Sequence, residues 1–290
     1  MEAFDAVAKT SLLTSALRAQ ENLREDRLYE DPYAAHLATA LGWDLFGQVA
    51  DATRPSSTQP GSQVTSTFDY NAIRTRFFDE YLVKATVDQG GGPAQVVLAA
   101  AGMDTRAYRL AWPGPVNLYE LDRPAVLAAK ESALEVVSVS PGVTRRTLGV
   151  DLLDDDWSAR LRERGYRPDE PSVWLLEGLL YYITEQQARR VLDQVRKASA
   201  PGSLVAADIV SATAFTSPAM QPLLDAFDRW GCPWLFGHDE PEAFFAEHGI
   251  KAQAVQPGEE HADYGRWRDA VHPRDVPDVE RVFLVHGRRT

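Results

Sequence analysis

Apolar residues follow helical spacing in the first part of the chain. Ala8 to Glu21 is a run of good helix formers with few breakers. Between Phe68 and Val87, the apolar residues Ile73, Phe77 and Tyr81 recur every four residues, which places them on one helix face. We therefore predict one helix in each stretch.

Turn-forming residues surround these helices. Asp31 followed by Pro32 is typical of a helix N-cap with proline at the first helical position. The polar stretch Asp51 to Gln63 contains two prolines and a glycine, which predicts a loop. The sequence Gly90-Gly91-Gly92-Pro93 must end the second helix, because proline cannot continue it.

Short apolar runs replace the helical spacing in the middle of the chain, and predicted helices alternate with them. One helix covers Arg123 to Leu134, and another covers Glu185 to Ala198, where Thr184 and Gln187 form a capping box. The five predicted strands are Gln95–Ala101, Val116–Asp122, Thr147–Leu152, Ser172–Leu176 and Ser203–Ile209. This alternation indicates a parallel α/β sheet, in which ligands lie beyond the carboxyl ends of the strands.

Aromatic residues are frequent from about Ser211 onwards. Two further strands are predicted there, at Lys251–Val255 and Arg281–Val285. The aromatic residues that stand among prolines and glycines are Phe215, Trp230, Trp234 and Phe236. They are typical of a flat apolar binding surface, and core packing is the alternative.

The composition is that of a soluble globular protein: of 290 residues, 44% are apolar and 25% are charged. The net charge of −12 argues against nucleic acid and anionic membranes as partners, because both bind basic surfaces. The single cysteine, Cys232, excludes an internal disulfide, and no Cys/His spacing suggests a metal site. The longest apolar run, Val96 to Met103, is too short to span a bilayer. Glu2 and Asp5 stand where a secretory signal would be basic, so we expect a cytoplasmic protein.

The first two predicted strands end in residues suited to a ligand. The first runs into Gly102, where a backbone without a side chain allows close approach; a plain strand-to-helix turn is the alternative. The second ends in Glu120 and Asp122, about twenty positions later, where a carboxylate can accept hydrogen bonds from ribose hydroxyls. Strand alternation puts both carboxylates on one face, and Asp122 can also cap the following helix.

The third and fourth predicted strands also end in carboxylates. The third strand ends at Asp151 and Leu152, and the Asp151 carboxylate is suited to binding an exocyclic amine. The run Asp154 to Asp156 is more typical of a solvated loop. Glu177 is surrounded by apolar residues and needs a partner, which is either a ligand or a structural ion pair.

The chain resembles the leucine carboxyl methyltransferase family in several ordered segments: SLLTSALRAQE, EDPYA, IRTRFFDEYL, QVVLAAAGMDTRAYRLAWP, LYELDRP, GVDLLDDDW and WLLEGLLYYIT. It is most similar to the bacterial branch of S-adenosylmethionine (SAM)-dependent O-methyltransferases, which includes carboxyl methyltransferases of polyketide tailoring. The resemblance covers about residues 8–210 and thins beyond them.

This resemblance implies a Rossmann-like class I SAM-dependent methyltransferase sheet, with N-terminal helices and a C-terminal substrate-covering segment. It implies a single methyltransferase domain over residues 1–290. Residues 1–90 would form a helical N-terminal cap, 91–210 the cofactor-binding sheet, and 211–290 the acceptor-side segment with the final strands.

The resemblance also implies a SAM site. Arg74 would hold the cofactor's carboxylate by a two-pronged guanidinium contact, and Glu177 would face its ammonium group. Asp122 would bind the ribose hydroxyls. The residue types agree with the chemistry of SAM, a zwitterion with a sulfonium group, which needs one cation and several acids.

Four more positions of this site follow from the family pattern. Asp151 and the backbone of Leu152 would bind the adenine, and Ala100 and Gly102 would line the turn beneath the methionyl portion. The chain departs from the family at Ala100, where glycine is usual. It departs again at Thr14, which aligns with a lysine of the eukaryotic branch.

Several functions stay open. The favoured one is SAM-dependent methylation of a carboxylate on a small molecule, such as a polyketide-type acid, because a carboxylate is ionised at neutral pH and needs no general base. A phenol or other hydroxyl usually needs one, and His238 and His261 are the candidates in the C-terminal part. A non-catalytic SAM-binding protein is a further alternative. A nicotinamide-linked oxidoreductase is disfavoured, because the three-glycine turn is missing.

Overall fold

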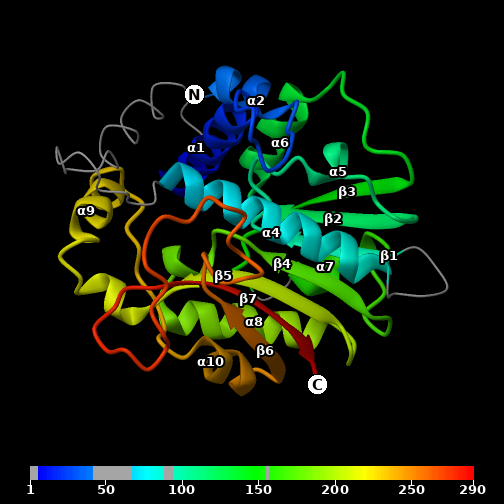
Figure 1. The fold of residues 1–290 in the computed structure, drawn as a ribbon. Helices are drawn as coiled ribbons and strands as arrows, with labels where there is room; N and C mark the ends of the chain where they lie inside the picture. Colours follow the sequence, from blue (N-terminus) through cyan, green and yellow to red (C-terminus); the bar gives the residue numbers. More distant parts are fainter. Residues whose placement is uncertain (1–5, 42–66, 88–93, 155–156) are drawn as a thin grey trace.

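The computed structural model describes residues 6–41, 67–87, 94–154 and 157–290. The predicted loop from Asp51 to Gln63 and the sequence Gly90–Pro93 lie outside these ranges. Figure 1 shows a central sheet with helices packed on both of its faces. No helix in the described ranges is long and apolar enough to cross a membrane.

Among the described residues, seven strands form one sheet in the order β3-β2-β1-β4-β5-β7-β6. The strands are β1 (Ala94–Ala99), β2 (Val116–Asp122), β3 (Val143–Gly149), β4 (Ser172–Leu176), β5 (Leu204–Val210), β6 (Ile250–Val255) and β7 (Val282–Arg289). Strands β1 to β5 pair in parallel, and β7 pairs antiparallel with both β5 and β6. The predicted parallel α/β sheet is confirmed, with an antiparallel pair added at one edge.

Helices cover both faces of this sheet. They are α1 (Ala6–Glu21), α2 (Ala34–Leu41), α4 (Thr67–Val87), α5 (Arg106–Arg109), α6 (Pro124–Ala133), α7 (Trp157–Glu163), α8 (Glu185–Ala198), α9 (Gln221–Arg229) and α10 (Pro241–Glu247). Two short 3-10 helices follow β4 and β5, namely η1 (Leu180–Tyr182) and η2 (Ala212–Phe215).

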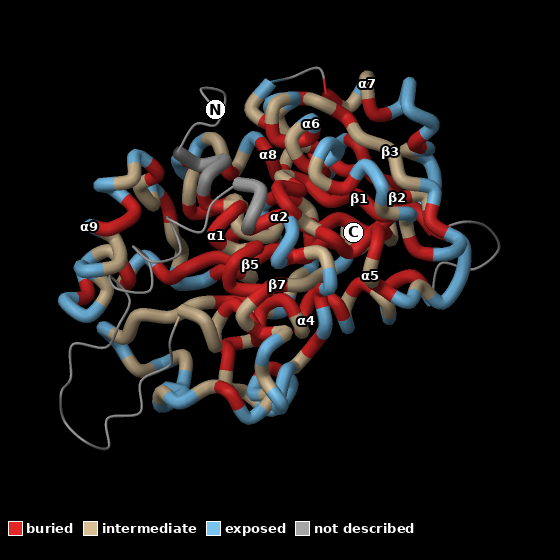
Figure 2. Tube along the Cα trace, turned by 90° about the horizontal axis from the view of Figure 1, so that it is seen from above, coloured by how far each residue is buried: buried red, intermediate tan, exposed pale blue. Residues whose placement is uncertain are grey.

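The alternation of side chains along β1 explains the two layers. Val97 and Ala99 pack into a core with residues of α7, α8 and α10, whereas Val96 and Leu98 pack into a second core with residues of α4 and α6. Since successive strand residues point to opposite faces, an all-apolar strand is buried on both. Figure 2 shows this buried centre, with exposed residues at the periphery.

Most predicted boundaries agree with the structure. Strands β2 and β4 and helix α8 have the predicted bounds. The capping box is present, with Gln187 N donating to Thr184 Oγ1 at 3.3 Å and Thr184 N to Gln187 Oε1 at 2.8 Å. The prediction for the third strand is wrong, because β3 spans Val143–Gly149 and Leu152 lies beyond it. Strand β3 is at the edge of the sheet, so its polar residues are tolerated there and hide its start.

Candidate functional site

A cavity of about 430 Å³ lies at the carboxyl ends of β1, β2 and β4. Residues of α1, α4 and η1 complete its wall. The seven residues that the family resemblance assigned to the cofactor all line it: Arg74, Ala100, Gly102, Asp122, Asp151, Leu152 and Glu177. The fold thus brings together positions that are distant in the sequence.

Backbone amides hold Asp122 at one end of the cavity. Its Oδ2 accepts a hydrogen bond from Gly102 N at 2.6 Å, and its Oδ1 accepts one from Arg123 N at 2.7 Å. Burial raises the pKa of the Asp122 carboxyl, although both amides favour its charged form. Each oxygen retains a lone pair for a ligand hydroxyl. Glu120 is fully buried with its Oε2 2.9 Å from Lys130 Nζ, and it is outside the cavity lining of the described chain.

The turn after β1 has two residues in the left-handed conformation, Ala100 with φ +59° and Gly102 with φ +44°. A Cβ atom added to Gly102 would lie 2.8 Å from the Cβ of Ser11, so glycine lets α1 pack closely on this turn. Ala100 has a Cβ and adopts a conformation that favours glycine, which stores strain next to the cavity.

Asp151 and Leu152 close the same end of the cavity. The carboxylate of Asp151 is exposed and accepts a hydrogen bond from Leu153 N at 2.9 Å, whereas Leu152 is buried. A carboxylate beside an apolar side chain can hold a flat ring that carries an amino group. Asp154 is exposed, as expected for a solvated loop, and residues 155–156 lie outside the described ranges.

Two carboxylates hold Arg74 at the opposite end. Its Nε lies 2.9 Å from Glu177 Oε1, and its Nη1 lies 2.9 Å from Asp208 Oδ2. Nη1 also donates to the Tyr181 hydroxyl at 3.0 Å. Within the described part of the chain, Nη2 makes no hydrogen bond. It is therefore the guanidinium nitrogen that is available to an anionic ligand, and the structure leaves one of the two predicted contacts open, because Nε and Nη1 already face protein groups.

Arg106, which the sequence analysis does not single out, is the second cation of this end. It is 3% exposed and pairs through Nε with Asp79 at 2.7 Å, and through Nη1 with Glu177 at 2.7 Å. Burial alone would raise the pKa of the Asp104 carboxyl. The Arg106 guanidinium outweighs this effect and lowers the pKa of Asp104 to about 2. Glu177 thus has two ion-pair partners, Arg74 and Arg106. The Asp-Thr-Arg run after the β1 turn was the available signal.

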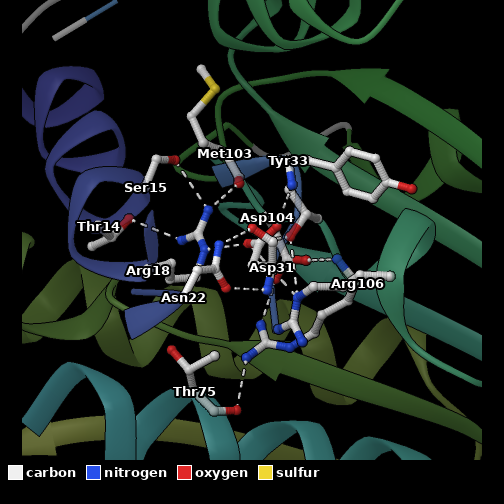
Figure 3. Close-up of polar contacts among 12 residues, drawn as sticks. Thr14, Ser15, Arg18, Asn22, Asp31, Tyr33, Thr75, Met103, Asp104 and Arg106 are labelled. Carbon is white, nitrogen blue, oxygen red and sulfur yellow. Dashed lines mark hydrogen bonds and ion pairs between the residues drawn. The ribbon is translucent and has the colours of Figure 1, made fainter. Parts of the chain in front are cut away.

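Helix α1 is tied to the same turn, as Figure 3 shows. Arg18 donates from Nε to Asp31 at 2.8 Å and from Nη2 to the Met103 carbonyl at 2.6 Å. Asp31 also accepts from the Thr105 hydroxyl at 2.6 Å. Its other oxygen accepts from Tyr33 N at 3.2 Å and caps the turn before α2. These contacts fix α1 as part of the cavity wall. The prediction of Pro32 as the first helical residue is wrong, because α2 begins at Ala34.

Around Tyr181 and Tyr182, the described part of the chain lines the cavity with uncharged residues. Burial raises the pKa of the Tyr181 and Tyr182 hydroxyls, which keeps both neutral. Leu235 is 50% exposed at this wall and its backbone N donates to the Tyr181 carbonyl at 2.7 Å. We call this part the neutral wall, and it consists of Thr10, Ser11, Thr14, Leu179, Tyr181, Tyr182, Ile183, Gln187 and Leu235.

The aromatic residues of the C-terminal segment lie outside the lining of this cavity, among the residues described. Trp230 and Trp234 pack with Phe227 against α1, and Phe236 packs in the core. The interpretation as an acceptor surface is therefore wrong for these residues, and core packing is correct. Trp234 instead packs against the lining residue Tyr181, with the two ring centroids 4.7 Å apart.

The two candidate histidines are also elsewhere. His238 stacks on Phe244 with ring centroids 5.3 Å apart, and His261 is exposed. Neither is among the described residues that line the cavity.

The hydrogen-bond donors and acceptors that line the cavity fit SAM. The Arg74 Nη2 atom suits a carboxylate, and the Glu177 carboxylate suits an ammonium group. At the other end, Asp122 offers free lone pairs next to a glycine turn. Arg74 and Glu177 thus lie at one end of the cavity, where they match the amino-acid portion of SAM. Asp122 lies at the other end, where it matches the adenosine.

Comparison with known proteins supports this fit. The family model for leucine carboxyl methyltransferase matches residues 11–196. A relative from Mycobacterium marinum, named for SAM-dependent methyl transfer, is 34% identical over 97% of this chain and 95% of its own. One from Mycolicibacterium smegmatis with a similar name is 34% identical over 90% of this chain and 87% of its own.

Solved structures share the fold. A duf574 family protein from Streptomyces avermitilis superimposes with a TM-score of 0.62 at 13% identity and covers 97% of both chains. A protein from Thermobifida fusca, named for methyl transfer, gives a TM-score of 0.60 at 18% identity and covers 96% of this chain and 94% of its own.

Proposed function

Because this chain belongs to the leucine carboxyl methyltransferase family of SAM-dependent methyltransferases, we propose that it methylates a carboxylate oxygen of a small molecule. The single observation that carries the choice of acceptor is the neutral wall around Tyr181, Tyr182 and Leu235. A carboxylate is ionised at neutral pH without help, so it suits a wall on which the described residues offer no unpaired carboxylate or imidazole as a base.

In this proposal the charged ends of the cavity hold SAM, which supplies a methyl group activated by its sulfonium. Arg74 binds the cofactor's carboxylate through Nη2, and Glu177 faces its ammonium group. Asp122 accepts from the ribose hydroxyls. The adenine-side residues are Asp151 and Leu152, and Ala100 and Gly102 line the turn beneath the methionyl portion.

The titratable groups near the neutral wall are poor general bases. Glu177 is paired with Arg74 and Arg106, and Asp104 is paired with Arg106. The raised pKa values of Tyr181 and Tyr182 keep these hydroxyls protonated. A phenol acceptor needs a base to remove its proton, whereas a carboxylate does not.

The residues of the neutral wall then act by positioning and by excluding water. Tyr181 is fixed by Arg74 and Asp208, so its ring holds one place at the cavity. A carboxylate oxygen that loses its water shell in this wall is a better nucleophile, and the alignment replaces a bimolecular encounter.

Product chemistry tests the proposal. The protein is incubated with methyl-labelled SAM and a panel of aliphatic acids, aromatic acids and phenols, and products are identified by mass spectrometry. We expect labelled methyl esters, which release labelled methanol in mild alkali. A label that survives this treatment, as in an aryl methyl ether, contradicts the proposal. The Asp122→Ala variant is the control that ties the label to this cavity.

A further inference from the structure

Asp208 lies on β5 directly behind the amino-acid end of the cavity. It is 0% exposed and is outside the cavity lining among the described residues. Its Oδ1 accepts from Gly178 N at 2.6 Å. Its Oδ2 lies 2.9 Å from Arg74 Nη1 and accepts from the hydroxyls of Tyr70 at 3.2 Å and Tyr181 at 3.3 Å. One buried carboxylate thus holds four donors from two segments of the chain, namely α4 and the segment that follows β4.

Three of these four donors belong to residues that line the cavity, namely Arg74, Gly178 and Tyr181. Gly178 has φ +67° and follows Glu177, so fixing its amide also fixes the turn that carries the Glu177 carboxylate. Arg74 uses Nη1 for Asp208 and Nε for Glu177, and these two contacts orient the plane of its guanidinium.

We propose that Asp208 is a positioning residue that aligns Arg74 and the Gly178 turn for the amino-acid portion of SAM. The inference rests on the proposed function, because it takes the ligand to be SAM. Asp208 touches no ligand atom in this account and acts only through the residues that it holds.

The charge of Asp208 is essential to this arrangement. Burial and the nearby Asp208 charge both raise the pKa of the Tyr70 and Tyr181 hydroxyls, so both remain protonated donors. An asparagine at this position can still accept from Gly178 N, but its amide NH2 would face Arg74 and two hydroxyl groups. Arg74 would then lose one of its two carboxylate contacts.

Two ligands test the two ends of the cavity separately. S-adenosylhomocysteine carries the amino-acid portion, whereas methylthioadenosine lacks it and retains the adenosine. We expect Asp208→Asn to weaken binding of S-adenosylhomocysteine by about tenfold or more in calorimetric titration, and of methylthioadenosine by less than about twofold. A purely structural role would weaken both ligands equally.

The matched control is Glu21→Gln. Glu21 is also 0% exposed and also paired with an arginine, with Oε1 3.0 Å from Arg266 Nη2, but it lies outside the described cavity lining. We expect this variant to lose stability while the ratio of the two dissociation constants stays at the wild-type value.

If Asp208→Asn fails to fold, Tyr70→Phe replaces it, because this change removes one hydroxyl that donates to Asp208. We expect a loss of about threefold for S-adenosylhomocysteine and none for methylthioadenosine. Equal losses for both ligands, or no loss for either, overturn the role of Asp208. Wild-type protein that binds neither ligand overturns the proposed function itself, and this inference with it.

Discussion

The two ends of the cavity hold their carboxylates in different ways. At the adenosine end, Asp122 and Asp151 accept hydrogen bonds from backbone amides of neighbouring turns. At the amino-acid end, Glu177, Asp104 and Asp208 each pair with the side chain of a buried arginine, and Asp104 and Asp208 accept from a backbone amide as well. The first arrangement depends on backbone geometry, whereas the second depends on ion pairs, and those of Glu177 and Asp208 join distant segments.

This difference has an energetic consequence. A carboxylate that is held by amides keeps its partners when a neighbouring side chain changes. A buried ion pair does not, because removal of one partner leaves the other charge buried and unpaired. The amino-acid end should therefore be sensitive in stability as well as in binding, whereas the adenosine end should be sensitive mainly in binding.

The largest expected effect is on Arg106. Arg106→Ala removes the partner of Asp104 and one partner each of Glu177 and Asp79, so the free energy of unfolding should fall by about 3–5 kcal/mol. Urea unfolding measures this change. In the control Arg167→Ala, which breaks an exposed pair with Glu170, the loss should be below about 0.5 kcal/mol. Similar losses in both variants would remove the distinction between buried and exposed pairs.

The adenosine end is tested by Asp122→Ala. We expect the loss of a charge-assisted contact to weaken S-adenosylhomocysteine and methylthioadenosine alike, by about 1.5–3 kcal/mol each in calorimetric titration. The control Asp154→Ala removes a nearby exposed carboxylate outside the described cavity lining and should leave both affinities unchanged. A loss of affinity for S-adenosylhomocysteine alone would contradict the assignment of Asp122 to the adenosine end.

The carboxylates of the two ends should also differ in how they change the stability of the fold with pH. The pKa of Asp104 is lowered from 3.8 to about 2, so its charge stabilises the fold above about pH 3.8 and this stability is lost as the pH falls towards 2. Asp104→Asn should therefore cost about 2 kcal/mol at pH 7 and less at pH 3. Burial raises the pKa of Asp122, so its ionisation should instead weaken the fold as the pH rises.

Urea unfolding of wild-type protein and of Asp104→Asn at pH 7 and pH 3 measures the stability cost of the substitution at each pH. A difference between the two proteins that is the same at both pH values would contradict the ion pair as the cause.

The smallest effect concerns the strained turn of the adenosine end. Because Ala100 has φ +59°, Ala100→Gly should raise the free energy of unfolding by roughly 0.5–1 kcal/mol, as relief of strain outweighs the added chain entropy. The control Ala99→Gly lies in β1, where the backbone is extended, and should lower stability. Thermal unfolding of both variants checks the sign, and a loss at Ala100 would show that the turn is not strained.

The same contrast explains what the sequence could predict. Gly102 and Asp122 stand at the ends of apolar strands, so their local setting indicated a ligand edge. Strand β2 and helix α8 were predicted within their observed bounds for the same reason, since period and capping are local signals. The start of β3 could not be found, because its edge position removes the apolar signal on which the prediction depends.

The long-range ion pairs of Arg74 and Arg106 could not be predicted from local patterns. Arg106 pairs with Asp79, which is 27 positions away, and with Glu177, which is 71 positions away. Arg74 and Asp208 are 134 positions apart. Only an acid within the otherwise apolar strand LVAADIV hinted that Asp208 has a buried partner.

The central claim is that this cavity binds SAM, and one calorimetric titration tests it most directly. Wild-type protein is titrated with S-adenosylhomocysteine and, in parallel, with NADH. The account predicts saturable binding of one S-adenosylhomocysteine per chain and no heat with NADH. Binding of NADH, or no heat with millimolar S-adenosylhomocysteine, would contradict it.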